Sequence, residues 1–128
     1  MVILDTNVII DHISQAPGKP TYLKRIVSTN PKEMPALSLV SLQELYEGES
    51  TKDRKIEITL IKTITPLKIL PYTREIAKLA GIIARDLKRP IEFPDAAIAA
   101  TAILNKAELA TLNKKDFREI KNLKFVDL

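Results

Sequence analysis

Acidic side chains recur in this chain at places where a short apolar run gives way to a helical pattern. They are Asp5, Glu44, Asp95 and Asp116, and Asn113 lies shortly before the last of them. Carboxylates that share one pocket repel one another unless a cation lies between them, and oxygen ligands suit Mg²⁺ or Mn²⁺. If the fold brings these side chains together, we expect a divalent-metal site that activates water for hydrolysis.

The same residues have a simpler role available at the ends of helices. Asp and Asn are favoured N-caps, and the helix dipole stabilises a negative charge at a helix N-terminus. Ser41 and Glu44 have the spacing of a capping box, and Asn113 and Asp116 have the same spacing with a shorter acid. Capping explains each residue taken singly, so a metal site requires that the residues meet in one place.

Short apolar runs alternate with helical patterns along the chain, which predicts a parallel sheet covered by helices on both faces. Strands are expected at 2–4, 36–39, 67–70, 109–111 and 124–126, and helices at 7–14, 21–28, 42–48, 52–64, 73–88, 95–105 and 114–120. A parallel sheet binds its ligands outside the carboxyl ends of its strands. We therefore expect the acids to face that edge.

The composition is that of an ordinary globular protein, and the 128 residues are expected to form one domain, 1–128. No apolar run approaches the roughly 20 residues that cross a bilayer, and there is no cysteine, so a cytoplasmic protein is expected.

The surface is expected to be basic. Lys and Arg number 20 against 16 Asp and Glu, so four acids gathered in a pocket would leave 20 positive against 12 negative charges, a formal +8, on the remaining surface. An acidic pocket in a basic surface suits a phosphate polymer and a divalent cation.

Four stretches together resemble the PIN-domain ribonucleases, in particular the VapC-type toxins of toxin–antitoxin pairs. They are VILDTNVIID, LVSLQELYEGE, DAAIAATAILNKAELATLNKKDF and the closing KFVD, in the order and approximate spacing of the family. The first stretch alone also resembles hydrolases of the haloacid dehalogenase type, but those need a second acid where this chain has Asn7. The resemblance implies a three-layer α/β/α sandwich on a parallel sheet of strand order 3-2-1-4-5.

The resemblance also implies an activity and the residues that perform it. The activity is metal-dependent hydrolysis of RNA by an endoribonuclease that has a cognate antitoxin protein as its partner. Asn7 and Thr111 are expected to be polar accessories of the site. The expected metal-binding acids are Asp5, Glu44 and Asp95, with Asn113 or Asp116 completing the pocket.

Apolar residues in the expected helix 52–64 bear on assembly. Ile58 lies outside the main apolar stripe of that helix, and Ile82 lies outside the stripe of helix 73–88. Single exposed apolar residues are normal in a monomer. Together with the family resemblance, however, they lead us to expect a homodimer. The stripe itself consists of Ile56, Leu60, Ile61 and Ile64.

Three other functions remain open at this point. A housekeeping PIN nuclease would process RNA without an antitoxin. A phosphoacceptor receiver domain also binds Mg²⁺ through acids, but it expects an early pair of acids and a Lys after its last strand, which this sequence lacks. A non-catalytic binding domain is disfavoured because no expected acid is missing.

His12, the only histidine, is expected at the surface or an interface rather than in catalysis.

Overall fold

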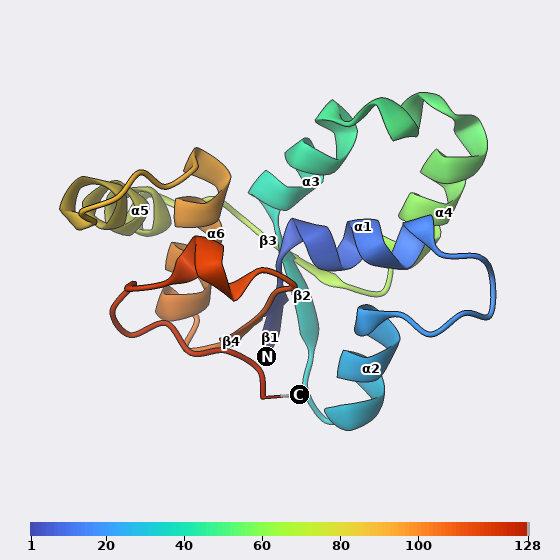
Figure 1. Ribbon diagram of the computed structural model, residues 1–128, viewed down its shortest axis with the longest axis horizontal. Helices are drawn as coiled ribbons and strands as arrows, with labels where there is room; N and C mark the ends of the chain where they lie inside the picture. The colour runs from blue at the N-terminus through green and yellow to red at the C-terminus, as the bar shows by residue number, and fades with distance from the viewer. Residues whose placement is uncertain (128) are drawn as a thin grey trace.

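The computed structural model describes residues 1–127, and at its centre is a sheet of four parallel strands (Figure 1). Ile3 in the first strand lies opposite Ala36 in the second and Leu109 in the fourth. The observed strands fall within a residue of the predicted ranges, and the prediction of a parallel α/β fold is confirmed. They are β1 (Val2–Leu4), β2 (Pro35–Ser38), β3 (Lys68–Leu70) and β4 (Glu108–Ala110), in the order β3-β2-β1-β4.

The fifth predicted strand, 124–126, is reduced to a single residue pair. Phe125 forms an isolated parallel bridge with Leu109. Backbone hydrogen bonds hold it there, from Leu109 N to Lys124 O at 2.8 Å and from Val126 N to Leu109 O at 2.9 Å. This segment therefore lies beyond β4, in the place that a strand order of 3-2-1-4-5 requires.

Helices cover both faces of the sheet and complete three layers, as the resemblance implied. Val2 and Leu4 point into a core formed with α1, α2 and α4, whereas Ile3 points into a second core formed with α6. Figure 1 shows α1, α2 and α4 on one side of the strands and α5 and α6 on the other. The α-helices within residues 1–127 are α1 (Thr6–Ser14), α2 (Tyr22–Thr29), α3 (Leu39–Glu47), α4 (Arg54–Ile64), α5 (Arg74–Asp86) and α6 (Phe93–Leu104).

Small side chains allow α6 to lie between the sheet and α5. Its Ala96 and Ala100 pack against Ile76 and Ala80 of α5, and its Ala99 faces the core under the sheet. The alanine run therefore has a packing role in addition to its high helix propensity. Although α6 is apolar, neither it nor any other helix in the described part of the chain has the length and apolarity needed to cross a membrane.

The predicted start of α3 is wrong by three residues. The helix begins at Leu39 because Ser38 is its N-cap, with the Ser38 hydroxyl accepting a hydrogen bond from Val40 N at 3.1 Å. Ser41 and Glu44 consequently lie inside the helix, and the capping box predicted from their spacing does not form. Glu44 is thus free of a capping role.

Three other predicted helices are shorter than expected. The helix predicted at 73–88 is α5, which spans Arg74–Asp86. The helix predicted at 52–64 begins at Arg54, because Asp53 is its N-cap and accepts a hydrogen bond from Lys55 N at 2.9 Å; a 3₁₀ turn, η1 (Glu49–Lys52), precedes it. The range 114–120 contains only the 3₁₀ turn η2 (Lys114–Phe117). Glu119 has a φ of 66°, which a right-handed helix cannot contain, so the turn ends before it.

Candidate functional site

Asp5 directly follows β1 and is held at the carboxyl edge of the sheet by two hydrogen bonds. Its Oδ1 accepts from Thr6 N at 2.8 Å, and its Oδ2 accepts from the Thr111 hydroxyl at 2.7 Å. Burial raises the pKa of Asp5 above its ordinary value, and the hydrogen bonds from Thr111 and Thr6 offset part of that rise. Asp5 is therefore both the N-cap of α1 and a buried acid in the pocket, so the two sequence interpretations are compatible for this residue.

Glu44 points from the second turn of α3 toward the start of α1. Its Oε1 accepts a hydrogen bond from the Thr6 hydroxyl at 2.6 Å, and the same hydroxyl lies 2.9 Å from Ser41 Oγ. Burial raises the pKa of Glu44 most, and the charge of Asp5 raises it further, while the bond from Thr6 lowers it. The side chain is thus a half-buried acid linked to Asp5 through one threonine.

Asp95 lies in the first turn of α6 and has the most perturbed acidity in this group. Burial and then the charges of Asp5, Asp116, Glu44 and Glu92 raise its pKa to about 7. Glu92 is the N-cap residue of α6, and within residues 1–127 no hydrogen bond to the Asp95 carboxylate is found. The capping interpretation therefore fails for Asp95, and its repulsion by the three acids from other parts of the chain indicates a shared pocket.

Asp116 and Asn113 contact each other at the exposed rim of this pocket. Asn113 Nδ2 donates to Asp116 Oδ2 at 2.9 Å, and neither side chain caps η2 in the reciprocal manner that their spacing suggested. The charge of Asp116 nevertheless raises the pKa of both Asp5 and Asp95, so it acts on the pocket. The backbone of η2 is held by Arg89, whose Nη2 donates to Asp116 O at 3.2 Å and to Arg118 O at 2.7 Å.

The group of acids suits a hard divalent cation in its chemistry, because it offers only oxygen ligands and an excess of negative charge. As the side chains stand, however, no three acids or histidines in the described residues are close enough to share one ion. Glu44 and Asp116 each have one carboxylate oxygen hydrogen-bonded within the protein, to Thr6 and to Asn113. Coordination of one ion by all of these acids requires their carboxylates to approach one another more closely.

The polar accessories predicted at this edge are present, and others were missed. Asn7 donates to Thr111 Oγ1 at 3.4 Å and accepts from Leu112 N at 3.3 Å, so it lies at this edge beside Thr111. Thr6 and Ser41 were missed, although a hydroxyl residue directly after Asp5 is a usable signal. Arg89 was missed as well, because nothing in the sequence indicated that its guanidinium group binds the backbone of η2. The hydrogen bond of His12 is formed away from these acids, because its Nδ1 lies 2.8 Å from the Thr21 hydroxyl.

The family of the chain follows from comparison with known proteins. The family profile of the PIN domain matches residues 2–123. The chain belongs to the PIN-domain family. Ribonuclease VapC10 of Mycobacterium tuberculosis is 32% identical over 127 residues, which cover 97% of this chain and 91% of the relative. Ribonuclease VapC19 of the same organism is 29% identical over 120 residues, covering 91% of this chain and 92% of the relative.

Solved structures agree with this assignment. VapBC2 from Rickettsia felis, bound to a DNA fragment from its promoter, contains a chain with a TM-score of 0.84 and 26% identity. DNA-bound VapBC from Salmonella typhimurium contains one with a TM-score of 0.83 and 26% identity, and each alignment covers 98% of this chain and 96% of the other. The chain is a PIN-domain ribonuclease of the VapC type, as the resemblance implied. A receiver domain is excluded.

Proposed function

We propose that this VapC-type protein hydrolyses RNA with Mg²⁺ or Mn²⁺ held among Asp5, Glu44, Asp95 and Asp116. One observation carries the choice of residues. Burial, the charges of the three other acids and that of the neighbouring Glu92 raise the pKa of Asp95 to about 7, so the ionised pocket repels itself in the absence of a cation. A divalent ion relieves that repulsion and is bound most tightly when the acids are ionised. A single metal site at this edge accounts for the type, burial and coupling of these carboxylates.

The chain's own residues set the orientation of the acids. Thr111 and the backbone of Thr6 each direct one oxygen of Asp5, and the Thr6 hydroxyl directs Glu44. A bound divalent ion supplies a water of lowered pKa and stabilises charge on the leaving oxygen. Glu44 has two roles open to it, as a ligand or as the base that accepts a proton from the attacking water. Its raised pKa brings it nearer to the range in which a base works at neutral pH.

The proposal includes an antitoxin protein as partner and a cytoplasmic location, where cellular RNA is available. Its support is the likeness to chains in VapBC toxin–antitoxin complexes of Rickettsia felis and Salmonella typhimurium. A housekeeping nuclease without an antitoxin is not favoured by these neighbours.

The proposal also includes a homodimer. Of the stripe predicted on α4, Leu60 is buried in the core, whereas Ile61 is exposed together with Ile58 outside the stripe. A second apolar surface is a groove of about 270 Å³ beside α5 that includes Ile82 and Ile83. Light scattering at micromolar concentration tests this assembly, and a monomer of 14.4 kDa would contradict it.

The function is tested by incubating the purified protein with cellular RNA in Mg²⁺, in excess EDTA, and with the Asp95→Asn variant. Cleavage is expected only for the wild-type protein with metal. Cleavage that continues in excess EDTA would overturn the metal-dependent mechanism. Expression in a bacterial host is expected to arrest growth, and co-expression of a neighbouring small gene is expected to relieve the arrest. RNA cleavage without any growth arrest would instead support a housekeeping nuclease.

A further inference from the structure

A hollow of about 680 Å³ opens between α1, α2 and Leu112, and we call it the α2 hollow. It is an open depression of the surface rather than an enclosed cavity, which suits an extended strand. We propose that the α2 hollow binds a nucleotide of the single-stranded RNA next to the bond that is cleaved. This proposal rests on the proposed ribonuclease function and specifies where the substrate lies. Its lining includes Tyr22, Lys24, Arg25, Ser28, Asp11 and Leu112.

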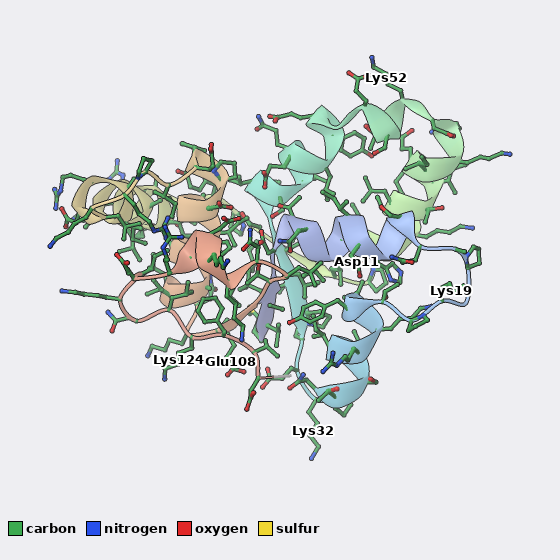
Figure 2. The ribbon with its side chains drawn as sticks, viewed as in Figure 1. Asp11, Lys19, Lys32, Lys52, Glu108 and Lys124 are labelled. Carbon is green, nitrogen blue, oxygen red and sulfur yellow. The ribbon has the colours of Figure 1, made fainter. Side chains whose placement is uncertain are left out.

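The α2 hollow begins where the acidic pocket ends. Leu112 directly follows Thr111, whose hydroxyl donates to Asp5. The backbone N–H of Leu112 donates to Asn7 Oδ1 at 3.3 Å, which ties the rim of the hollow to the first turn of α1. Asp11 lies one helical turn beyond Asn7, and Figure 2 shows it on the side of α1 toward α2. An RNA strand whose phosphate lies among the acids therefore meets this hollow next.

The charge of the α2 hollow suits a phosphate. Lys24 and Arg25 are both exposed, and neither forms an ion pair with a carboxylate in residues 1–127. Lys24 Nζ donates to the Lys19 carbonyl at 2.8 Å, which orients the ammonium group without neutralising it. The single carboxylate in the lining, Asp11, accepts a hydrogen bond from Tyr22 N at 3.1 Å. Two cations face one acid, and unpaired Lys and Arg side chains are the groups that bind nucleic-acid phosphates.

The α2 hollow also offers surface for a base. Tyr22 is half-buried, with its side chain packed against the core below α2 and its remaining surface in the hollow. Leu112 on the other side is 50% exposed and adds apolar surface to the hollow. Proteins that bind single strands combine a positively charged groove with aromatic side chains on which bases stack. The α2 hollow has both features.

The apolar groove beside α5 does not suit RNA. It is lined by Leu79, Ile82 and Ile83, and its charged lining consists of Asp86, Glu119 and Lys121. Two acids and one cation suit a phosphate less well than the two cations and one acid of the α2 hollow, and an apolar surface of this kind suits a protein segment. Charge therefore favours the α2 side of the acidic pocket for the RNA strand.

The proposal is tested by the binding of a fluorescein-labelled single-stranded RNA of about 12 nucleotides, a length typical of such sites. Anisotropy is recorded in EDTA, so that binding is measured without cleavage. The variant is Lys24→Ala with Arg25→Ala. Its matched control is Arg74→Ala with Lys78→Ala, which removes from α5 one Arg and one Lys that are exposed and form no ion pair in residues 1–127. Thermal unfolding of each variant verifies that it is folded, and the single variant Arg25→Gln repeats the test with a smaller change.

The double substitution Lys24→Ala with Arg25→Ala, called the hollow variant, is expected to raise the Kd for the RNA about tenfold. It is also expected to reduce the slope of log K against log salt by about 1.4, because two phosphate contacts are lost. The control variant is expected to stay within about twofold of wild type. Tyr22→Leu is expected to weaken RNA binding without changing the salt slope, because it removes the aromatic ring but no charge. Tyr22→Phe retains the ring and is expected to bind RNA as tightly as wild type.

Equal effects of the hollow and control variants on the Kd overturn the proposal. So does an unchanged RNA affinity combined with lost binding of the antitoxin, since the hollow would then be a protein-docking site. If wild type cleaves RNA while the hollow variants bind it normally, only the α2 hollow assignment fails. If wild type neither binds nor cleaves RNA, the proposed function fails with it.

Discussion

The hydroxyl of Thr6 donates a hydrogen bond of 2.6 Å to Glu44, a residue 38 positions away in the chain. The backbone N–H of Thr6 donates to Asp5 at 2.8 Å. One buried threonine therefore fixes the orientation of two acids that come from different strands and helices. Such outer groups hold a ligand in the geometry that a metal requires and tune its basicity.

Thr6→Val is expected to lower RNA cleavage by about 10–100-fold, the usual cost of losing a group that orients a metal ligand. Valine has nearly the same shape, so the core around this buried residue is preserved while the bond to Glu44 is lost. Thr6→Ser retains the hydroxyl and serves as the control. Steady-state cleavage at several Mg²⁺ concentrations measures the effect, and equal activity of the valine and serine variants would contradict it.

Asp95→Asn is expected to abolish cleavage and to leave the metal-free protein at least as stable as wild type at neutral pH. The ordinary pKa of an Asp carboxyl is 3.8, and the pKa of Asp95 in the fold is about 7. Between those values the folded state binds more protons than the unfolded state, so this residue makes the free energy of unfolding fall as the pH rises. The amide variant has no such dependence.

Thermal unfolding in EDTA at about pH 5 and about pH 8 tests this prediction. The drop in melting temperature between the two is expected to be larger for wild type than for Asp95→Asn, and Mg²⁺ is expected to reduce it in wild type. Comparing the two proteins cancels the contributions of groups that are not coupled to Asp95, including His12, whose pKa is lowered by burial. A lower stability of the variant at neutral pH would indicate that Asp95 has a structural role instead.

The sequence predicted the sheet and the acids better than it predicted the helix ends. The strands and their shared edge follow from the alternation of apolar runs with helices, so Asp5 and Asp95 could be located in advance. The start of α3 could not, because Ser38 and Ser41 are both good N-caps and only the end of β2 decides between them. Arg89 could not be found either, since it binds backbone carbonyls, which carry no signature in the sequence.

Arg89→Ala is expected to raise the Mg²⁺ concentration needed for half-maximal cleavage by about tenfold, a typical effect of an outer group on metal affinity. Its guanidinium binds the carbonyl of Asp116 at 3.2 Å, so its loss loosens the turn that positions this acid. Arg85→Ala, which removes an exposed Arg from α5, is the control. In an Asp116→Asn background the Arg89 change is expected to add little further effect. Full additivity of the two changes would contradict the positioning role.

The last prediction concerns which residue completes the pocket, Asp116 in η2 or Asn113 directly before it. The Asn113 side-chain amide donates to Asp116 Oδ2 at 2.9 Å, so the two side chains meet at the exposed rim. Asn113 is neutral and can offer an ion only its amide oxygen. Asp116 carries a charge that already acts on the pocket, because it raises the pKa of Asp5 and Asp95.

Charge governs Mg²⁺ affinity more than an amide dipole does, so Asp116→Asn is expected to weaken metal binding more than Asn113→Ala. Titration of Mg²⁺ against cleavage gives the half-maximal concentration for each variant. Calorimetric titration of Mn²⁺ without RNA gives the metal affinity independently of turnover. Because Asn113→Ala also releases Asp116 from its hydrogen bond, its effect is expected to be small. If Asn113→Ala instead shows the larger rise, the Asp116 carboxylate serves only the local turn and Asn113 provides the fourth ligand.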